Sequence, residues 1–344
     1  MRTGTDMKLI IQIPCLNEEH TLPATLADLP RQIDGIDCIE ILVIDDGSDD
    51  RTTEVARSLG VHHIVRHSSN CGLGRAFRSG LDRALKEGAD IIVNTDGDGQ
   101  YSGACIADLV KPVLEGRADI VIGDRRTANN PEFGAIKKLL QRLGSYVVRT
   151  LSGVAVHDAV SGFRAISAKA ALRLNVLSTF SYTVEMIIQA GNKQMRVVSV
   201  PVDTNPATRE SRLFRNIPQF VSRQLVGMLR MYAMYRPMRF FFYLGSLLSA
   251  IGIIPVVRFL LAYSAGEGDG HIQSLVLGGA FLTMGFMVFV SGLLSDLISH
   301  NRQLAEITLE KVRAMELERI RNTASLEQAA LARASDPGRG TEQP

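Results

Sequence analysis

The sequence predicts an α/β fold with a doubly wound, mostly parallel sheet, followed by a basic segment, a two-helix membrane hairpin and a charged helix. Two observations support this prediction. Short apolar segments alternate with segments of helical periodicity from Leu9 to Ile122, a pattern typical of parallel sheets with helices on both faces. Farther along, two apolar runs each reach the length of about 20 residues that a helix needs to cross a bilayer.

The alternating part contains strands and helices in regular succession. Each expected strand is a short, mainly apolar run, and an expected helix lies between each strand and the next. In chain order the elements are strand 9–13, helix 18–29, strand 39–44, helix 52–59, strand 62–66, helix 74–86, strand 90–95, helix 106–114 and strand 119–122. Together they form the expected domain 1–204.

Polar clusters follow four of these strands. In doubly wound sheets, ligands bind at the carboxyl ends of the strands. The clusters fall at those ends and comprise residues 14–19, 45–49, 94–100 and 123–126. We therefore predict a ligand site at this edge of the sheet.

The cluster Asp96-Gly97-Asp98-Gly99-Gln100 carries the clearest chemistry. Two carboxylates one residue apart, just past a buried strand, can share an Mg²⁺ or Mn²⁺ ion, because both ions prefer oxygen ligands. The two glycines allow the backbone to approach a ligand closely. Taken alone, such a string is more often an ordinary turn. Its position after a strand favours the metal site.

The doubled acids Asp45-Asp46 follow the second strand. One interpretation is a turn in which Ser48 or Asp49 caps the next helix. Two acids exceed that need, and a carboxylate here could bind the base or ribose of a nucleotide. The nearby glycine string starting at Gly72 lacks the third glycine of a dinucleotide loop, because position 77 is Phe. This departure disfavours a dehydrogenase.

The apolar excess lies in a hairpin, residues 240–299, with spans 240–263 and 272–298. Arginines flank it on both outer sides, whereas the connecting turn is acidic apart from His271. The positive-inside rule therefore places both termini in the cytosol of a multi-pass protein of the cell (inner) membrane. A pair of buried core helices is the alternative. The run 9–13 is too short for a signal peptide, so domain 1–204 is expected in the cytosol.

Segment 205–239 holds seven arginines against one acid and has apolar residues at helical spacing. It reads as a basic amphipathic helix at the membrane interface, or else as an ordinary surface helix. Residues 300–334 alternate in charge and are expected to form a solvated helix that packs on the body or on another subunit of a homo-oligomer. Residues 335–344 are expected to be a disordered tail.

Composition excludes several classes of protein. The 38 basic and 36 acidic residues give a net charge of +2, which argues against a nucleic-acid binder. Four scattered cysteines have neither zinc-site spacing nor the pattern of a disulfide scaffold. Tryptophan is absent.

Five strings, in this order, resemble family 2 glycosyltransferases, and with the hairpin the similarity is closest to the polyprenyl-phosphate sugar transferases. They are IPCLNEE (13–19), DDGS (45–48), NCGLG (70–74), DGDGQ (96–100) and SGFR (161–164). The resemblance covers roughly residues 8–300. It implies a GT-A fold, a nucleotide-diphosphate sugar donor carrying UDP or GDP, and a polyprenyl phosphate acceptor. One sugar would be transferred, with inversion.

The resemblance also implies roles for individual residues. Asp96 and Asp98, with Gln100, would hold the metal against the diphosphate, and Asp158 would line the sugar and acceptor side. The nucleoside and diphosphate would contact Pro14, Leu16, Glu18, Asp45 or Asp46, Gly97, Arg209 and Arg212, and the phosphate of the lipid would contact Arg125, Arg142 and Arg164. One departure concerns the arginine that relatives often carry six residues before a Ser-Lys pair. Here the pair is Ser211-Arg212 and position 206 is Pro, so Arg209 is the expected substitute.

Two other functions share some of these features. A processive polysaccharide synthase would be expected to carry a Gln-x-x-Arg-Trp string and more spans, whereas this chain has no Trp and one hairpin. A catalytically inactive, membrane-anchored scaffold would not need Asp96, Asp98, Arg125 and Arg209 together. The sequence does not name the sugar.

Overall fold

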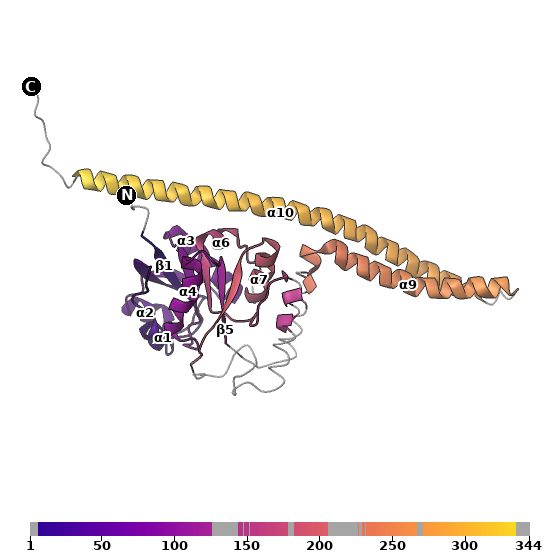
Figure 1. Ribbon diagram of the computed structural model, residues 1–344, viewed down its shortest axis with the longest axis horizontal. Coiled ribbons are helices and arrows are strands. Elements are labelled where there is room, and N and C mark those ends of the chain that lie inside the picture. Colours follow the sequence, from indigo (N-terminus) through magenta and orange to yellow (C-terminus); the bar gives the residue numbers. More distant parts are fainter. Residues whose placement is uncertain are drawn as a thin grey trace, which may run out of the picture. The chain divides into compact units, whose positions relative to one another are not determined.

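The computed structural model describes residues 6–125, 144–146, 148–150, 152–177, 182–205, 226, 229–230, 232–266 and 271–334 (Figure 1). The chain divides into two compact units. One comprises Met1–Arg215 and Thr308–Pro344, and the other comprises Asn216–Ile307.

The first unit is built on a mixed sheet with strand order β3-β2-β1-β4-β6-β5-β7. The first four strands along the chain are mutually parallel, and β7 is parallel to β5. The strands are β1 (Lys8–Cys15), β2 (Cys38–Asp45), β3 (His63–Arg66), β4 (Ile91–Asn94), β5 (Ile120–Asp124), β6 (Arg164–Ser167) and β7 (Val197–Pro201). The predicted mostly parallel α/β sheet is therefore confirmed.

The sequence periodicity predicts neither β6 nor β7, nor the helices Ala168–Arg173 and Thr183–Asn192. Strand β6 is the one of these strands with reversed direction. It runs antiparallel to both of its neighbours, β4 and β5. Arg164, its first residue, pairs with Asn94 at the carboxyl end of β4 and with Ile122 in β5. Because β6 is reversed, the loop that precedes it reaches the same edge of the sheet as the polar clusters after the parallel strands.

Helices pack on the sheet through alternate residues of its strands. In β1, Leu9, Ile11 and Ile13 join a core that includes Ile106 and Leu109 of α4. Helix α3 lies close to the sheet at Gly80, where an added Cβ would come within 2.5 Å of Gln12 Oε1. The helices are α1 (Leu22–Asp28), α2 (Thr52–Ser58), α3 (Leu73–Lys86), the 3-10 turn η1 (Gly103–Cys105), α4 (Ile106–Leu114), α6 (Ala168–Arg173) and α7 (Thr183–Asn192).

Most predicted elements agree with the structure to within a few residues. The largest difference is the first helix, which begins at Leu22 rather than at Glu18. The intervening residues form a polar loop in which Asn17 has a φ of 55°, a left-handed conformation that cannot continue a helix. Helix α4 has the predicted bounds.

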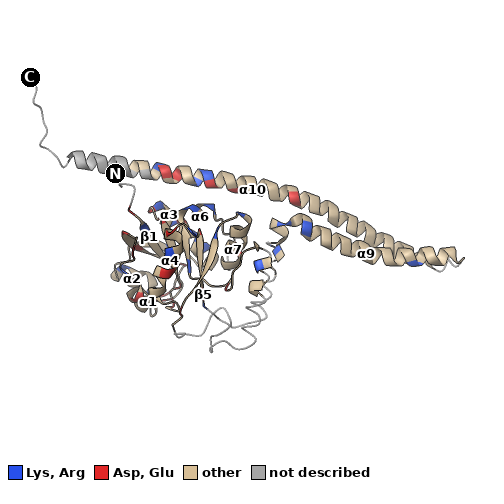
Figure 2. Cartoon of the chain, in the orientation of Figure 1, with Lys and Arg blue, Asp and Glu red and all other residues tan. Residues whose placement is uncertain are grey.

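The second unit contains α9 (Pro237–Ser264) and the first part of α10 (Ile272–Ala334), which continues into the first unit. Both helices are long and apolar enough to cross a membrane, as the sequence predicts. Residues coloured as charged are sparse on α9 and on the half of α10 beside it (Figure 2). Large apolar side chains such as Ile254 and Phe286 are exposed, as expected for a lipid-facing surface.

Glycines seven residues apart allow α9 and α10 to pack closely. An added Cβ at Gly252 would lie 2.9 Å from Gly278 O, and one at Gly245 would lie 3.1 Å from Gly285 O. Small residues at such positions let two helix backbones approach within a membrane. The two apolar helices therefore form a packed hairpin.

The charged part of α10, from Thr308 on, belongs to the first unit and packs on α3 and on the segment after α6. Arg313 Nη1 donates to Leu174 O over 3.2 Å, and its guanidinium lies 3.6 Å from Asp82 of α3. Lys86 Nζ of α3 lies 2.9 Å from Glu316 Oε1. Of the two expectations for this helix, these contacts favour packing on the body of the same chain. The second span and the charged helix are one continuous element.

Candidate active site

The parallel strands bring their polar loops to one edge of the sheet. Cys15 at the end of β1 is level with Asp45 at the end of β2, and Asp45 is level with Arg66 at the end of β3. The loop after β4 follows beside β1, because Gln12 is level with Asn94. Four loops distant in sequence therefore meet, in the place that the sequence predicts for a ligand site.

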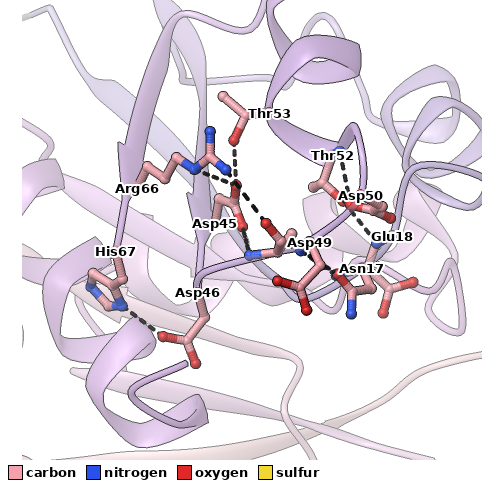
Figure 3. A network of polar contacts seen from close by, with 11 residues as sticks. Asn17, Glu18, Asp45, Asp46, Asp49, Asp50, Thr52, Thr53, Arg66 and His67 are labelled. Carbon is pink, nitrogen blue, oxygen red and sulfur yellow. Dashed lines mark hydrogen bonds and ion pairs between the residues drawn. The ribbon is translucent and has the colours of Figure 1, made fainter. Parts of the chain in front are cut away.

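The loop after β1 is held by the loop after β2 (Figure 3). Asn17 N donates to Ser48 Oγ over 2.9 Å, and Asp49 N donates to Asn17 Oδ1 over 2.9 Å. Glu18 N donates to Thr52 Oγ1 over 2.9 Å. These hydrogen bonds fix Glu18, which was predicted to contact the nucleoside, at the strand ends beside Pro14 and Leu16.

Asp45 is fully buried, and its carboxylate organises the loop that follows it. Ser48 N donates to Asp45 Oδ1 over 2.8 Å, Thr53 Oγ1 donates to Oδ2, and Arg66 Nε lies 3.5 Å from Oδ2. Of the two interpretations of the doubled acids, these contacts match the turn for Asp45. The expected cap is wrong, because the N-cap residue of α2 is Arg51 and neither Ser48 nor Asp49 caps the helix. Its burial leaves it as a support beneath the loop.

Asp46 is 4% exposed and binds the loop after β3. Cys71 N and Gly72 N donate to its oxygens over 3.0 and 2.8 Å, and His67 Nδ1 lies 2.6 Å from Oδ1. Asp46, His67 and Cys71 place three possible metal ligands within 4.8 Å of one another. Both oxygens of Asp46 already accept hydrogen bonds, so hydrogen bonding accounts for this cluster.

A pocket of about 500 Å³ opens between the loops after β2 and β3. Its lining consists of Gly47, Ser48, Asp49, Arg66, His67 and Ser68. Gly47 has a φ of 77°, and a Cβ there would lie 2.5 Å from Ser69 C, so only glycine fits. The sequence interpretation missed the residues from β3. Their position at the end of an expected strand could have indicated them, because β3 is parallel to β2 and ends at the same edge of the sheet.

The Asp96 loop is built against the loop that precedes β6. Asn94, fully buried, accepts a hydrogen bond from Gln12 and donates to Gly162 O over 2.9 Å. Tyr101 Oη in turn accepts a hydrogen bond from Gly162 N over 3.2 Å. An added Cβ at Gly162 would lie 3.1 Å from Asp96 Oδ1. Gly162 therefore determines where the Asp96 carboxylate lies.

The donor set at this loop fits a hard divalent cation. Asp96 and Asp98 are partly exposed carboxylates within one short loop, and Asp98 Oδ1 accepts a hydrogen bond from Gln100 N over 3.1 Å. Thr25 Oγ1 donates to Gly97 O over 3.1 Å, which anchors the loop to α1. Carboxylate oxygens are the ligands that Mg²⁺ and Mn²⁺ prefer.

Arg125 and Asp158 form a buried pair. Arg125 Nε and Nη2 donate to the two oxygens of Asp158 over 2.6 and 3.0 Å, and the side chains are 12% and 1% exposed. Burial alone would lower the pKa of Arg125, but nearby Tyr101 and Asp158 outweigh that effect and raise the pKa. Arg125 therefore stays charged beside Asp96. Burial, opposed by Arg125, raises the pKa of Tyr101 and keeps its hydroxyl neutral.

Arg164 differs from its predicted role at a lipid phosphate. Its side chain is fully buried, and its three guanidinium nitrogens donate to Ser161 O, Thr183 O and Ala159 O over 2.8 to 2.9 Å. Burial lowers its pKa to about 10. All three nitrogens of this guanidinium donate to backbone carbonyls, so Arg164 stabilises the 159–163 loop and does not contact the phosphate of a lipid.

Three other predicted residues, Arg142, Arg209 and Arg212, lie outside the described residues. Most of the expected interface segment 205–239 also lies outside them. Asn205 is described and donates to Gly99 O over 2.9 Å. The chain therefore returns to the Asp96 loop at the first residue of this segment.

Replacing Gly162 by alanine is expected to lower activity by about tenfold or more with little loss of folding. The added methyl would meet both the Asp96 carboxylate and the Tyr182 hydroxyl, at 3.1 and 3.2 Å. The measurement is the initial rate of the sugar transfer that the resemblance implies, together with a thermal melt. Gly279→Ala in α10 is a matched control, because an added Cβ there meets nothing within 4 Å and φ is not positive. Equal rates for Gly162→Ala and the wild type would contradict this placement of Asp96.

A sheet of this order, with an acidic loop after β4 and a polar pocket between the loops after β2 and β3, is typical of a GT-A type α/β fold. Comparison with known proteins supports that class. The model of Glycosyl transferase family 2 matches residues 10–174. An uncharacterized protein of Methanocaldococcus jannaschii is 34% identical over 204 residues, covering 57% of this chain and 81% of the relative.

Two further comparisons are informative. Undecaprenyl-phosphate mannosyltransferase of Micrococcus luteus is 29% identical over 206 residues, covering 57% of this chain and 83% of that protein. The crystal structure of glucosyl-3-phosphoglycerate synthase from Mycobacterium tuberculosis, in complex with Mn²⁺, UDP and phosphoglyceric acid, has a TM-score of 0.53 at 18% identity, covering 66% of this chain and 78% of that one. This likeness concerns the fold. The chain belongs to glycosyltransferase family 2 and is a glycosyltransferase.

Proposed function

We propose that this enzyme transfers one sugar from a nucleotide-diphosphate sugar to the phosphate of a polyprenyl phosphate in the membrane. The observation that carries the proposal is the combination, in one chain, of the Asp96 loop in a GT-A sheet with a packed hairpin of two apolar helices. An anchor of this kind would hold the enzyme at the bilayer, where a lipid acceptor lies. The similarity to an undecaprenyl-phosphate mannosyltransferase supports this acceptor class.

The residues divide the chemistry between them. Asp96 and Asp98, with Gln100, would hold Mg²⁺ or Mn²⁺, and the bound ion would neutralise charge on the departing diphosphate. Glu18 and the 500 Å³ pocket between the loops after β2 and β3 would receive the nucleoside. Arg125, held by Asp158, would place positive charge beside the reacting phosphates. Arg142, Arg209 and Arg212 are proposed to contact the phosphates of acceptor and donor.

The transfer itself needs no strong base. The acceptor phosphate is already anionic at neutral pH, and its oxygen would attack the anomeric carbon directly. The new carbon–oxygen bond forms as the bond to the nucleoside diphosphate breaks, and the nucleoside diphosphate leaves with the bonding electrons. In-line attack would invert the anomeric configuration.

The proposal is tested with purified enzyme, a polyprenyl phosphate, Mn²⁺ and a panel of UDP- and GDP-sugars. We expect one donor to give a lipid carrying a single sugar, with one nucleoside diphosphate released per product. A chelator should stop the reaction, and added Mn²⁺ or Mg²⁺ should restore it. Products longer than one sugar would instead identify a processive synthase. Failure of every donor, with the enzyme folded, would leave an inactive scaffold as the better explanation.

The proposed location is the cytosolic face of the cell membrane, with both termini in the cytosol. The basis is the distribution of arginines around the hairpin, such as Arg230, Arg236, Arg239 and Arg302. A protease-sensitive tag placed after Pro344 should therefore be protected in intact cells and cleaved after the membrane is permeabilised. A tag inserted in the turn between α9 and α10 is the control. It should be cleaved already in intact cells. Cleavage of the Pro344 tag in intact cells would contradict this topology.

A further inference from the structure

His67 occupies a position shared by the pocket and by the hydrogen-bond network of the doubled acids (Figure 3). Its backbone N donates to Asp45 O over 2.8 Å, which extends the pairing of β2 and β3. Its imidazole lines the pocket and contacts Asp46 through Nδ1. The other ring nitrogen, Nε2, lies 2.9 Å from Ser79 Oγ on α3. One ring therefore links β2, β3 and α3.

The direction of the hydrogen bond follows from its partner. An ionised carboxylate only accepts hydrogen bonds, so Nδ1 must carry the proton that is shared with Asp46. Ser79 can either donate to Nε2 or accept from it, because a hydroxyl does both. Ser79 therefore holds the ring in place whether the imidazole is neutral or charged.

Asp46 gathers the whole segment from His67 to the start of α3. Its two oxygens accept hydrogen bonds from the His67 ring and from the backbone N–H groups of Cys71 and Gly72. Gly72 has a φ of 92° and stands immediately before the first residue of α3. A negative charge at this helix start is favourable, but a carboxylate on a single-bonded side chain can still rotate away. Within the described part of the chain, the His67 ring is the side chain that hydrogen-bonds to Asp46 and opposes this rotation.

We propose that His67 is a positioning residue for the sugar donor: its Nδ1–H orients Asp46, and Asp46 then holds the 67–72 loop as the wall of the nucleoside pocket. This inference rests on the proposed function, because it assumes that a nucleoside enters the pocket. It does not require His67 to touch the reacting atoms. Loss of the contact should weaken donor binding and leave the chemical step largely unchanged.

Two substitutions separate the two ring nitrogens. In His67→Asn, the amide nitrogen is as many bonds from the backbone as Nδ1, so it can still donate to Asp46 and loses Ser79. In His67→Gln, the amide nitrogen corresponds to Nε2, so it can reach Ser79. Asp46 then loses the side-chain donor and keeps only its backbone donors. His62→Gln is the matched control, because His62 is an exposed histidine just before β3 whose ring contacts Ile41 N.

The experiment measures the affinity for UDP and for GDP by calorimetry with Mn²⁺ present, and the KM and kcat for the donor sugar. For the nucleotide that the wild type binds, His67→Gln should raise the dissociation constant and the donor KM by about tenfold or more, the usual effect of losing a hydrogen bond to a charged group. The kcat should change by about twofold at most. His67→Asn and His62→Gln should stay within about threefold of the wild type.

Amide hydrogen exchange gives a readout that needs neither nucleotide nor acceptor. The N–H groups of Cys71 and Gly72 should lose protection in His67→Gln and keep it in His67→Asn. If both variants weaken binding equally, or if neither changes exchange at these two amides, the proposal is wrong. Altered exchange without any nucleotide binding by the wild type would instead contradict the proposed function. If His67→Gln does not fold, Ser79→Ala replaces it, with a smaller but parallel loss expected.

Discussion

Asp98→Ala is expected to reduce sugar transfer by about a thousandfold or more while the protein stays folded. The carboxylate lies in the short loop after β4 and is partly exposed, so its removal takes no packing from the core. What it removes is an oxygen ligand at the place where charge develops on the leaving diphosphate. Rates with saturating donor and lipid, combined with a thermal melt, measure both effects.

The matched control for this prediction is Asp108→Ala, which removes an exposed acid from the first turn of α4, outside the 94–100 cluster. It should keep full activity. Binding of Mn²⁺ in the presence of a nucleoside diphosphate, followed by electron paramagnetic resonance, gives a second readout. Asp98→Ala with normal Mn²⁺ binding and more than about a tenth of the wild-type rate would show that the metal lies elsewhere.

Asp158→Ala is expected to lower the free energy of unfolding by about 3–5 kcal/mol, in addition to abolishing activity. The substitution leaves the Arg125 guanidinium buried without its carboxylate partner, and an uncompensated charge in a core is costly. Denaturant unfolding of the isolated protein in detergent measures the change. The half-exposed pair Lys86–Glu316 is the comparison, because Glu316→Ala should cost less than about 1 kcal/mol.

A double variant separates stability from catalysis. Arg125→Met combined with Asp158→Leu removes both charges and should recover much of the lost stability, because no buried charge remains unpaired. It should not recover activity, since the positive charge beside Asp96 is gone. Recovery of sugar transfer by the double variant would show that the pair serves only the fold.

Much of the first unit was predictable because its signals are local. An apolar run followed by a helical pattern predicts a strand and then a helix, whatever surrounds them. The four polar clusters lie after such strands. Strand β6 has no comparable signal. It is four residues long, and its place between β4 and β5 results from pairing with strands distant in the chain.

The roles of charged residues were harder to predict than their positions. Asp45 and Arg164 were expected at ligands, whereas both are fully buried and bind the loops around them. Sequence spacing shows that a charged group lies near a strand end, but its partners come from other loops. For Arg164 these partners are carbonyls at residues 159, 161 and 183.

The sequence by itself determined the α/β class, the strand ends that carry polar residues, the Asp96 loop and the two apolar helices. These features depend on consecutive residues, through periodicity, apolar length and turn chemistry. Only the tertiary structure decided that Gly162 and Asp158 meet Asp96 and Arg125, and that His67 holds Asp46. Those contacts join residues about 20 to 70 positions apart. No local preference specifies them, because they arise only when strands distant in the chain pair in one sheet and bring their loops together.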